Sequence, residues 1–489
     1  MRTFLAAWNF LSEDIRSNSA YVLGREWNQI YRAVPCLIKT PKPPRFFNHE
    51  PSFPGQCPAF YLVRIFFNCR FYYPVFAVLF LDYGMSVEQF ALLNVAWAVA
   101  IVFLEVPSGA LGDVLGRKRM VLAATILMIL EMLILALVPL GNPNLVFALL
   151  LLNRILSGAA EASASGADEA LAYDSLKSQD RASEWPGVLS SLMRRQSIVF
   201  VLTMLTGAAL YDANLVNSVL ARLPGELSLA AEWCHRLPIV LTLLMAVAAL
   251  VTALRMRELP GFQRAEHFAF SEAWITMQEA FRWILARPYV LYMLLFFIAC
   301  DSMVRLHLTL GSQYLRLIQV PEAWFGFFSA AFAALGFFMP KLAERCVQRF
   351  RFESNAFFLA LFLWLSLCGL ALALPWFGII FSLLTSCGMF FIGYFFSHYL
   401  NQAIDSKNRA TLLSFKGLGL NLGYGAMGLA YAAWVRNLQA PNPDIAYADS
   451  IQVWPWYFLA VMLLLGLYGW IQRKTLFLRN PASESTPNS

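Results

Sequence analysis

The stretch MVLAATILMILEMLILALVPL, residues 120–140, holds a single charged side chain, Glu131. An α-helix rises about 1.5 Å per residue, so about 20 residues cross the roughly 30 Å hydrocarbon core of a bilayer. A run of this length and composition is therefore predicted to span a membrane as a helix.

Apolar runs of similar length recur along the whole chain and are separated by short polar segments. Because they do not gather into one block, the chain is predicted to cross the membrane many times. The predicted fold class is therefore all-α and integral to the membrane. The twelve predicted transmembrane helices cover residues 59–82, 88–109, 120–140, 144–166, 195–212, 237–255, 288–310, 323–340, 354–374, 376–400, 411–435 and 454–471.

The composition favours lipid surroundings over water. Of the 489 residues, 59 % are hydrophobic and 14 % are charged, whereas soluble domains carry about 25 % charged residues. The net charge of +7 is spread over short segments between apolar runs, which is typical of membrane orientation and not of a nucleic-acid-binding face. The sequence contains no Walker loop, HExxH, CxxC pair or G-x-S-x-G, so we expect neither an enzyme nor a bound cofactor or metal.

The basic residues predict the orientation of the chain. With the N-terminus placed in the cytosol, most Lys and Arg residues outside the apolar runs fall in cytosolic segments, and positive charge accumulates on that side of a membrane. Both termini are therefore predicted to be cytoplasmic, in a multi-pass protein of the cell inner (plasma) membrane. The basic residues in the predicted outer loops are Arg222, Arg236, Arg316 and Arg436.

This topology divides the chain into five segments. The longest internal cytosolic loop separates the helices into six and six. The segments are a cytosolic tail at 1–58, a six-helix bundle at 59–255, a central cytosolic loop at 256–287, a second six-helix bundle at 288–472 and a cytosolic tail at 473–489.

The segment between the second and third predicted helices, residues 105–119, reads EVPSGALGDVLGRKR. It resembles the signature loop of the major facilitator superfamily, G-x-L-a-D-r-x-G-R-k, although the family's arginine after the aspartate is Val114 here. The resemblance implies two six-helix bundles, the major facilitator fold, and a gating role for this loop. The gating residues that it implies are Glu105, Gly109, Asp113, Gly116, Arg117 and Lys118.

Two further stretches resemble parts of the same family. Residues 153–158, NRILSG, are similar to its R-x-x-x-G element, whose arginine is often tied to proton coupling and is Arg154 here. Residues 165–176, SGADEALAYDSL, resemble a bacterial subgroup of drug or metabolite exporters. Helix 5 reads TGAALY at 206–211, where antiporters of the family often carry G-P-x-x-G-G, so that element does not support antiport.

Charged side chains inside predicted helices are costly, and they usually pair or face a cavity. Arg154, Glu161 and Asp168 are spaced by seven, which predicts one shared helix face, and Asp301 and Arg305 are spaced for a pair within a helix. In one interpretation these charges line a central cavity in which a carboxylate such as Glu131 carries a coupling proton. In the other they are structural ion pairs between helices. The predicted substrate and proton pathway comprises Arg70, Glu131, Arg154, Glu161, Asp301 and Arg305.

These features predict a secondary active transporter of a small organic solute, coupled to protons and working in export. The buried arginines favour a solute with an anionic group. Two alternatives stay open, an importer or facilitator of an anionic metabolite on the same fold, and a membrane sensor or partner protein that no longer transports. The expected partners are the solute, protons and the lipid bilayer, without nucleic acid.

Overall fold

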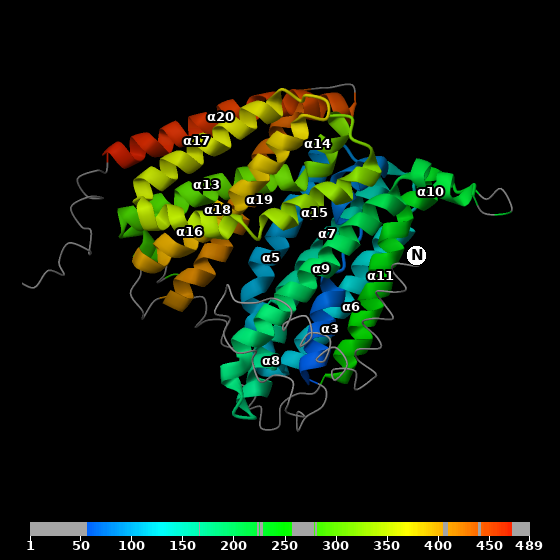
Figure 1. Cartoon of the computed structure of the whole chain (residues 1–489), viewed down its shortest axis with the longest axis horizontal. Helices are drawn as coiled ribbons and strands as arrows, with labels where there is room; N and C mark the ends of the chain where they lie inside the picture. Colours follow the sequence, from blue (N-terminus) through cyan, green and yellow to red (C-terminus); the bar gives the residue numbers. More distant parts are fainter. Residues whose placement is uncertain are drawn as a thin grey trace, which may run out of the picture. The chain divides into compact units, whose positions relative to one another are not determined.

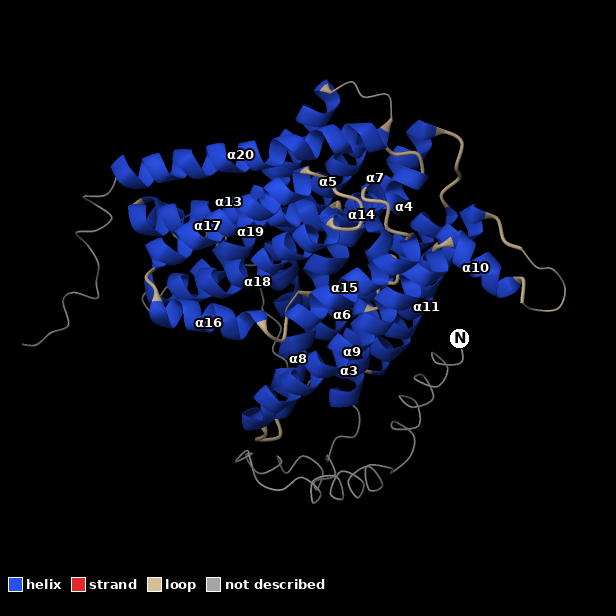
Figure 2. Ribbon diagram, turned by 45° about the horizontal axis from the view of Figure 1, so that its top comes forward, coloured by secondary structure: helices blue, strands red, loops and turns tan. Residues whose placement is uncertain are grey.

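A chain that crosses lipid repeatedly has to satisfy each backbone N–H and C=O group internally, which helices do. In the computed structural model, all regular structure in the described part of the chain is accordingly helical (Figure 2). The described residues are 56–165, 167–222, 224, 228–256, 278, 281–403, 409–438 and 442–471.

Some of the predicted segments fall outside these ranges. The predicted tail at 1–58 is outside them up to residue 55, and the predicted tail at 473–489 lies wholly outside. Most of the predicted loop at 256–287 is outside as well. The described residues from 56 to 256 are called the first half below, and those from 281 to 471 the second half.

The first half contains the long helices of the first predicted bundle and several short ones between them. They are α3 (Gln56–Asn68), η1 (Tyr73–Val75), α4 (Phe76–Asp82), α5 (Val87–Leu115), α6 (Arg117–Leu137), α7 (Pro143–Ala164), α8 (Ala167–Lys177), η2 (Ala182–Glu184), α9 (Trp185–Tyr211), α10 (Ala213–Leu220) and α11 (Ala231–Arg255).

The second half repeats this succession of long helices and short connections. Its helices are α13 (Pro288–Thr309), α14 (Gly311–Leu317), η3 (Glu322–Trp324), α15 (Phe325–Leu335), α16 (Met339–Arg349), α17 (Phe352–Ala371), α18 (Gly378–Ala403), α19 (Arg409–Asn437) and α20 (Pro443–Ile471).

All twelve predicted membrane-crossing ranges are largely helical. Within the described ranges, eleven helical segments are long and apolar enough to cross a membrane, and α19 occupies the remaining predicted range, 411–435. The predicted all-helical membrane fold is therefore confirmed. The helix ends differ by several residues, most of all for α20, which begins at Pro443 instead of residue 454.

Helix 1 was predicted to run unbroken over 59–82, but it unwinds between Asn68 and Tyr73. Pro74 has no N–H group, so it cannot donate the backbone hydrogen bond that would continue the helix through this stretch. The chain therefore restarts as η1, with the proline in its first turn. Arg70 lies in the unwound stretch, which frees it from the register of a helix.

Helix 4 also differs from its prediction. It ends at Ala164, because Ser165 leaves the helical region with ψ 112°, and Asp168 belongs to the next helix, α8. The prediction that Arg154, Glu161 and Asp168 share one helix face is therefore wrong for Asp168.

Helix 8 is longer than predicted and is broken. α15 ends at Leu335, and the chain resumes as α16 with Pro340 in its first turn. Lys341 and Arg345 follow the predicted range 323–340, and in the structure they lie on α16.

Two pairs of long helices join the halves. α5 lies beside α19, and α9 lies beside α15 (Figure 1). A Cβ atom at Gly326 would lie 2.5 Å from the carbonyl oxygen of Met204, and one at Gly428 would lie 2.8 Å from Val95. Glycine at these positions thus permits close helix approach, and one apolar cluster extends through both halves.

The outward surface of the helices is apolar, as lipid contact requires. Phe103 and Leu137 are each 71 % exposed, and Phe377 and Trp456 are 69 % and 67 % exposed. Soluble proteins rarely expose so many large apolar side chains together. This surface is the one expected of a helix bundle that is solvated by lipid.

Candidate functional site

A buried ion pair joins the unwound part of helix 1 to α6. One terminal nitrogen of Arg70 lies 3.0 and 3.1 Å from the two carboxylate oxygens of Glu131. The Arg70 and Glu131 residues are 3 % and 0 % exposed, and Tyr72 donates a hydrogen bond to Glu131 at 3.3 Å. A charge this deeply buried is tolerable only when it is paired and hydrogen-bonded, and both residues meet that condition.

Arg154, on α7, has no such partner. It is 6 % exposed, and it donates a hydrogen bond of 3.2 Å to the side-chain oxygen of Asn94 on α5. Its guanidinium lies over the rings of Phe76 and Trp97, 5.1 and 5.5 Å from their centres. Its Nε is buried without a hydrogen-bond partner, and among the described residues no carboxylate forms an ion pair with it.

Gly158, one turn beyond Arg154, determines how closely α7 approaches α5. A Cβ atom at Gly158 would lie 2.8 Å from Cβ of Ala100 and 2.9 Å from the carbonyl oxygen of Trp97. Only a glycine allows α7 to lie this close, and the closeness brings Asn94 and Trp97 onto Arg154. The R-x-x-x-G spacing thus has a packing reason in this chain.

The second half places its own charges on α13. Arg305 lies 2.7 Å from Asp301, which confirms the pair predicted within this helix. Arg305 also donates to Asn421 on α19 at 2.9 Å, and its guanidinium lies 5.4 Å from the ring centre of Tyr424. Asp301 is 2 % exposed, so its charge is neutralised inside its own half.

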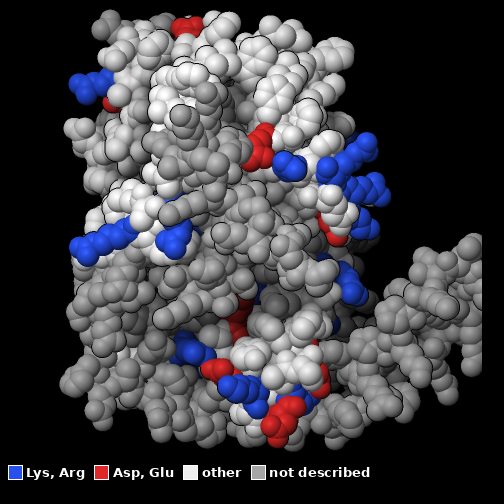
Figure 3. Space-filling view, turned by 90° about the vertical axis from the view of Figure 1, so that its left-hand side faces the viewer, with Lys and Arg blue, Asp and Glu red and all other residues white. Residues whose placement is uncertain are grey.

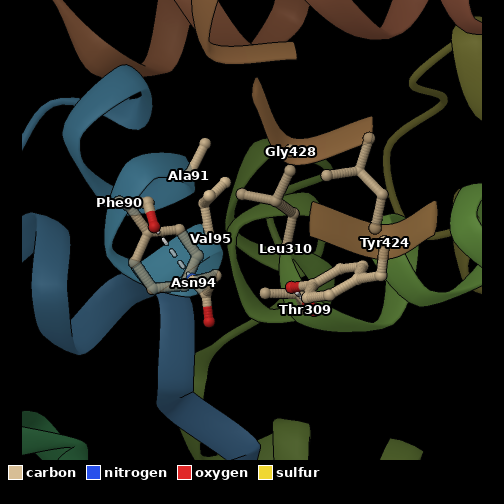
Figure 4. A pocket seen from close by; sticks show the side chains of 9 residues that line it. Phe90, Ala91, Asn94, Val95, Thr309, Leu310, Tyr424 and Gly428 are labelled. Atoms are coloured by element: carbon tan, nitrogen blue, oxygen red, sulfur yellow. Dashed lines mark hydrogen bonds between the residues drawn. The ribbon is translucent and has the colours of Figure 1, made fainter. Parts of the chain in front are cut away.

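A narrow pocket lies between the halves beside these groups (Figure 4). In the close-up, Asn94 of the first half lies across the pocket from Thr309 and Tyr424 of the second half. The hydroxyls of Thr309 and Tyr424 are 2.9 Å apart, and the ring of Tyr424 meets that of Trp97 edge to face. The pocket is lined by Phe90, Ala91, Asn94, Val95, Leu306, Thr309, Leu310, Tyr424 and Gly428.

The structure therefore gathers most of the predicted pathway residues at two places, one inside the first half and one at the interface between the halves. Arg70 pairs with Glu131 inside the first half, while Arg154 and Arg305 approach the interface through Trp97 and Tyr424. Glu161 is exposed on α7, and it forms no ion pair with another described residue. The functional roles of these residues stay predictions.

The predicted gating loop is mostly helical. α5 runs to Leu115 and α6 starts at Arg117, so Gly116 alone forms the turn, with a φ of 101° that favours glycine. Glu105 and Gly109 lie on the last turns of α5, and the side chain of Asp113 is outside the described part of the structure.

Two basic residues after this turn anchor it to other helices of the first half. Arg117 forms an ion pair with Asp174 on α8, and Lys118 donates a hydrogen bond to the carbonyl of Leu254 at 3.1 Å. Asp174 was not singled out in the sequence, although it lies in the stretch that resembles the exporter subgroup. We call the side of the helices that carries Gly116 the basic side, and the other the opposite side.

A second ion-pair cluster lies on the basic side of the first half. Arg64 on α3 lies 2.6 Å from Asp168 and 2.5 Å from Glu169, both at the start of α8. α8 is thus held to α3 and, through Asp174, to α6. In the view from the side on which α16 lies, the described Lys and Arg residues gather in small groups, several of them beside Asp or Glu (Figure 3).

On the opposite side, an ion pair that the sequence did not predict joins the halves. Arg316 at the end of α14 lies 2.7 and 2.8 Å from the two carboxylate oxygens of Asp82 at the end of α4. Tyr211 donates to Asp82 at 2.5 Å, and Glu322 lies 2.6 Å from Arg316. Arg316 was one of the few basic residues in a predicted outer loop. This exception to the charge pattern was the feature of the sequence that could have pointed to a role for Arg316.

Hydrogen bonds to backbone N–H groups also join the two halves on the opposite side. The hydroxyl of Ser312 on α14 accepts hydrogen bonds from the N–H groups of Ala77 and Val78 at 2.9 and 3.2 Å. These are amides of the first turn of α4, which has no side-chain cap of its own, so Ser312 caps that helix from the other half. Asp212 accepts from the N–H of Ala323 at 3.2 Å. Between described residues, all hydrogen bonds and ion pairs that join the halves lie on the opposite side.

Comparisons with known proteins agree with this architecture. The sequence profile described as Major Facilitator Superfamily matches residues 60–425, and no curated protein sequence matches the chain. Among solved structures, the nucleoside transporter NupG has a TM-score of 0.65 at 13 % identity, covering 84 % of this chain and 98 % of that one. At such identities the likeness shows the fold alone.

Two other solved structures have somewhat lower TM-scores. A bacterial homolog of the human lysosomal transporter Spinster, in an inward-facing and unoccupied conformation, has a TM-score of 0.60 at 17 % identity, covering 88 % of this chain and 98 % of that one. The D-xylose-proton symporter has a TM-score of 0.60 at 11 % identity, covering 85 % of this chain and 96 % of that one.

Proposed function

Because the chain belongs to the major facilitator superfamily and is a secondary transporter of a small solute, not an enzyme, we propose that it exports an organic anion in exchange for protons. The observation that carries the proposal is the position of its charges. Arg154 and Arg305 lie at the interface of two halves that are bonded to each other on the opposite side alone, among the described residues.

The proposed orientation places the basic side in the cytosol of a plasma-membrane protein, with both termini cytoplasmic. Positively charged helix ends on that side support it. In this orientation the conformation described here is closed toward the outside. The solute would then enter from the cytosol, toward Arg154 at the closed end, and leave after the halves rock about the interface.

The residues at the α5–α6 turn are proposed to gate the basic side. Arg117 and Lys118 hold the turn against α8 and α11 while that side is open. When the basic side closes, Gly109 on the exposed surface of α5 offers a place where the second half can approach without a side chain between.

Glu131 is proposed to carry the coupling proton. While Glu131 is ionised, it neutralises Arg70. Protonation of Glu131 would leave the guanidinium of Arg70 without a counter-charge in a buried place, and a buried unpaired charge is costly. Because of this cost, Glu131 releases its proton to the cytosol before the anion binds there, so the proton and the anion occupy the transporter in turn, as exchange requires.

Counterflow in proteoliposomes with an imposed pH gradient tests this function. With purified protein and a panel of organic acids supplied as radiolabelled solutes, we expect anion flux that speeds up when the opposite compartment is acidic. Glu131→Gln should keep anion counterflow while abolishing the dependence on the pH gradient. Flux that follows the proton inward identifies an importer, pH-independent flux a facilitator, and no flux with any solute a sensor or partner protein, and each of these contradicts proton-coupled export.

A further inference from the structure

We propose that the solute is an organic monoanion with an apolar body, and that Arg154 is the residue that binds its charge. This inference rests on the proposed function and assigns the chemical class of the solute to that same site. It follows from comparing the partners of the arginines inside the membrane-spanning helices and from the lining of the pocket between the halves.

Four arginines lie inside the predicted membrane-spanning ranges and away from their end residues, and three of these four are already neutralised. Arg64 pairs with Asp168 and Glu169, Arg70 pairs with Glu131, and Arg305 pairs with Asp301. Each of these cations has carboxylate neighbours within 3.0 Å. They do not need a ligand in order to be buried.

Arg154 is the exception among them. Its charge meets the neutral oxygen of Asn94 and the faces of two rings, and its Nε is buried without a partner. Rings and an amide oxygen compensate a buried guanidinium only in part, whereas a carboxylate accepts two of its hydrogen bonds at once. The site therefore lacks one negative charge, which a monoanion supplies.

The residues around Arg154 indicate the chemistry of the uncharged part of the solute. Asn94, which holds Arg154, also lines the pocket shown in Figure 4. Apart from Asn94, Thr309 and Tyr424, the lining is aliphatic, aromatic or glycine. Asn94 donates to the Phe90 carbonyl at 2.8 Å, Thr309 donates to the Arg305 carbonyl at 2.8 Å, and the hydroxyls of Thr309 and Tyr424 bond each other.

Those hydrogen bonds use the hydroxyl donors of Thr309 and Tyr424 and one N–H of Asn94. A solute with many hydroxyls, such as a sugar or a nucleoside, would find few groups there to replace its bonds to water, and it would pay for its desolvation. An apolar body loses nothing by entering the same surroundings. The chemistry of the site thus fits one negative charge at Arg154 and a hydrocarbon or aromatic remainder.

Lys416 on α19 is the rival for the anion. It is half-buried, it lies 4.8 Å from the ring centre of Phe396, and among the described residues it has no ion pair. Being more exposed than Arg154, its ammonium keeps part of its hydration, and it has less need of a counter-ion. A variant at each position separates the two sites.

Thermal unfolding of the detergent-purified protein tests the inference with matched probes. The panel is benzoate, phenylacetate and hexanoate with their neutral amides, and gluconate as a hydroxylated acid. We expect the apolar acids to raise the melting temperature in a saturable way, and the amides and gluconate to leave it unchanged. Arg154→Gln should weaken the apparent affinity for the acids at least tenfold, and Arg154→Lys by less.

The controls are Lys416→Gln and Arg222→Gln, the latter in an exposed outer loop, and both should respond to the acids like the wild type. Equal responses to acids and amides, loss of the response in Lys416→Gln instead of Arg154→Gln, or no response to any acid at about 10 mM would overturn the inference. Counterflow with the same panel keeps the two proposals apart. Binding of acids without flux contradicts transport alone, and flux of an amide or a sugar contradicts the assignment of the solute alone.

Discussion

Arg316 donates hydrogen bonds from its two terminal nitrogens to the two carboxylate oxygens of Asp82, at 2.7 and 2.8 Å, and so ties α14 of the second half to α4 of the first. α4 is the outer segment of the interrupted first membrane helix, and α14 follows the end of the membrane-spanning helix α13. Tyr211 and Glu322 hold the two partners from either side. This arrangement makes the Asp82–Arg316 pair the main bond that a rocking motion of the halves would have to break.

Asp82→Asn should shift the protein toward the conformation that is open on the opposite side. A charge-assisted hydrogen bond contributes about 1.5–3 kcal/mol, which corresponds to a change of roughly tenfold to a hundredfold in the ratio of the two conformations. The rate of thiol labelling at a cysteine introduced at Val78 measures that ratio. The matched control is Glu322→Gln, which removes a partner of Arg316 within its own half and should leave the rate near that of the wild type. Equal labelling rates in Asp82→Asn and the wild type would show that this ion pair does not hold the opposite side closed.

The Asp82–Arg316 ion pair should persist at alkaline pH. Burial opposes the charge of Arg316, but hydrogen bonds and charge from Asp82 and Glu322 outweigh it and raise the pKa of Arg316 above its ordinary value. A cation whose pKa is raised stabilises the paired state at every pH below its ordinary pKa, and it loses that contribution only as the pH passes its raised value. We expect the opposite side to stay closed from about pH 7 to pH 10. The measurement is the protection of the α4 amides against hydrogen exchange, relative to unprotected amides at the same pH, and it should stay constant over that range. Opening within that range would show that another group controls closure.

Ser312→Ala should destabilise the same closed side through the backbone. Without the hydroxyl, the amides of Ala77 and Val78 lose their acceptor at the start of α4, and a buried unsatisfied donor costs about 1–3 kcal/mol. Hydrogen exchange of those amides should accelerate by a corresponding factor. Ser218→Ala on exposed α10 removes a hydroxyl that donates to a carbonyl within its own helix, and it should leave α4 protected. Protection of α4 that survives in Ser312→Ala would show that water replaces the cap.

Gly158→Ala should disturb the Arg154 site without touching it. The added Cβ would lie within 2.9 Å of both Ala100 and Trp97, and overpacking of this kind costs about 1–3 kcal/mol. The melting temperature should fall, and benzoate should stabilise the variant less because Asn94 and Trp97 move away from Arg154. Gly466→Ala on α20 meets nothing within 4 Å, so its melting temperature should stay near that of the wild type. If benzoate stabilises Gly158→Ala as much as the wild type, the close α5–α7 contact is not needed to form the Arg154 site.

The sequence was sufficient for the helices but not for their interruptions. Runs such as 120–140 predict a spanning helix because lipid requires both length and apolarity. Hydropathy does not register a break such as the one before Pro74, since Cys69, Phe71 and Tyr72 are compatible with lipid and the break depends on backbone geometry. For the same reason the end of α7 at Ala164 was missed.

Contacts within one helix were predictable, and contacts between helices were not. Asp301 and Arg305 follow a spacing that pairs them in any helix. The partners of Arg70 and Arg316 lie on other helices, and the lack of a carboxylate at Arg154 is known only when every neighbour is placed. A list of buried charges therefore named candidate residues without showing which of them was left unpaired.

Distances between spin-labelled cysteines on each side of the membrane test alternation between the two conformations most directly. In a variant without native cysteines, one label pair at Val219 and Phe377 reports on the opposite side, and another at Ser178 and Gln348 reports on the basic side; all four positions are exposed. If the two halves alternate, Asp82→Asn lengthens the Val219–Phe377 distance and shortens the Ser178–Gln348 distance in the same molecules. Two distances that stay unchanged, or that lengthen together, would contradict this alternation.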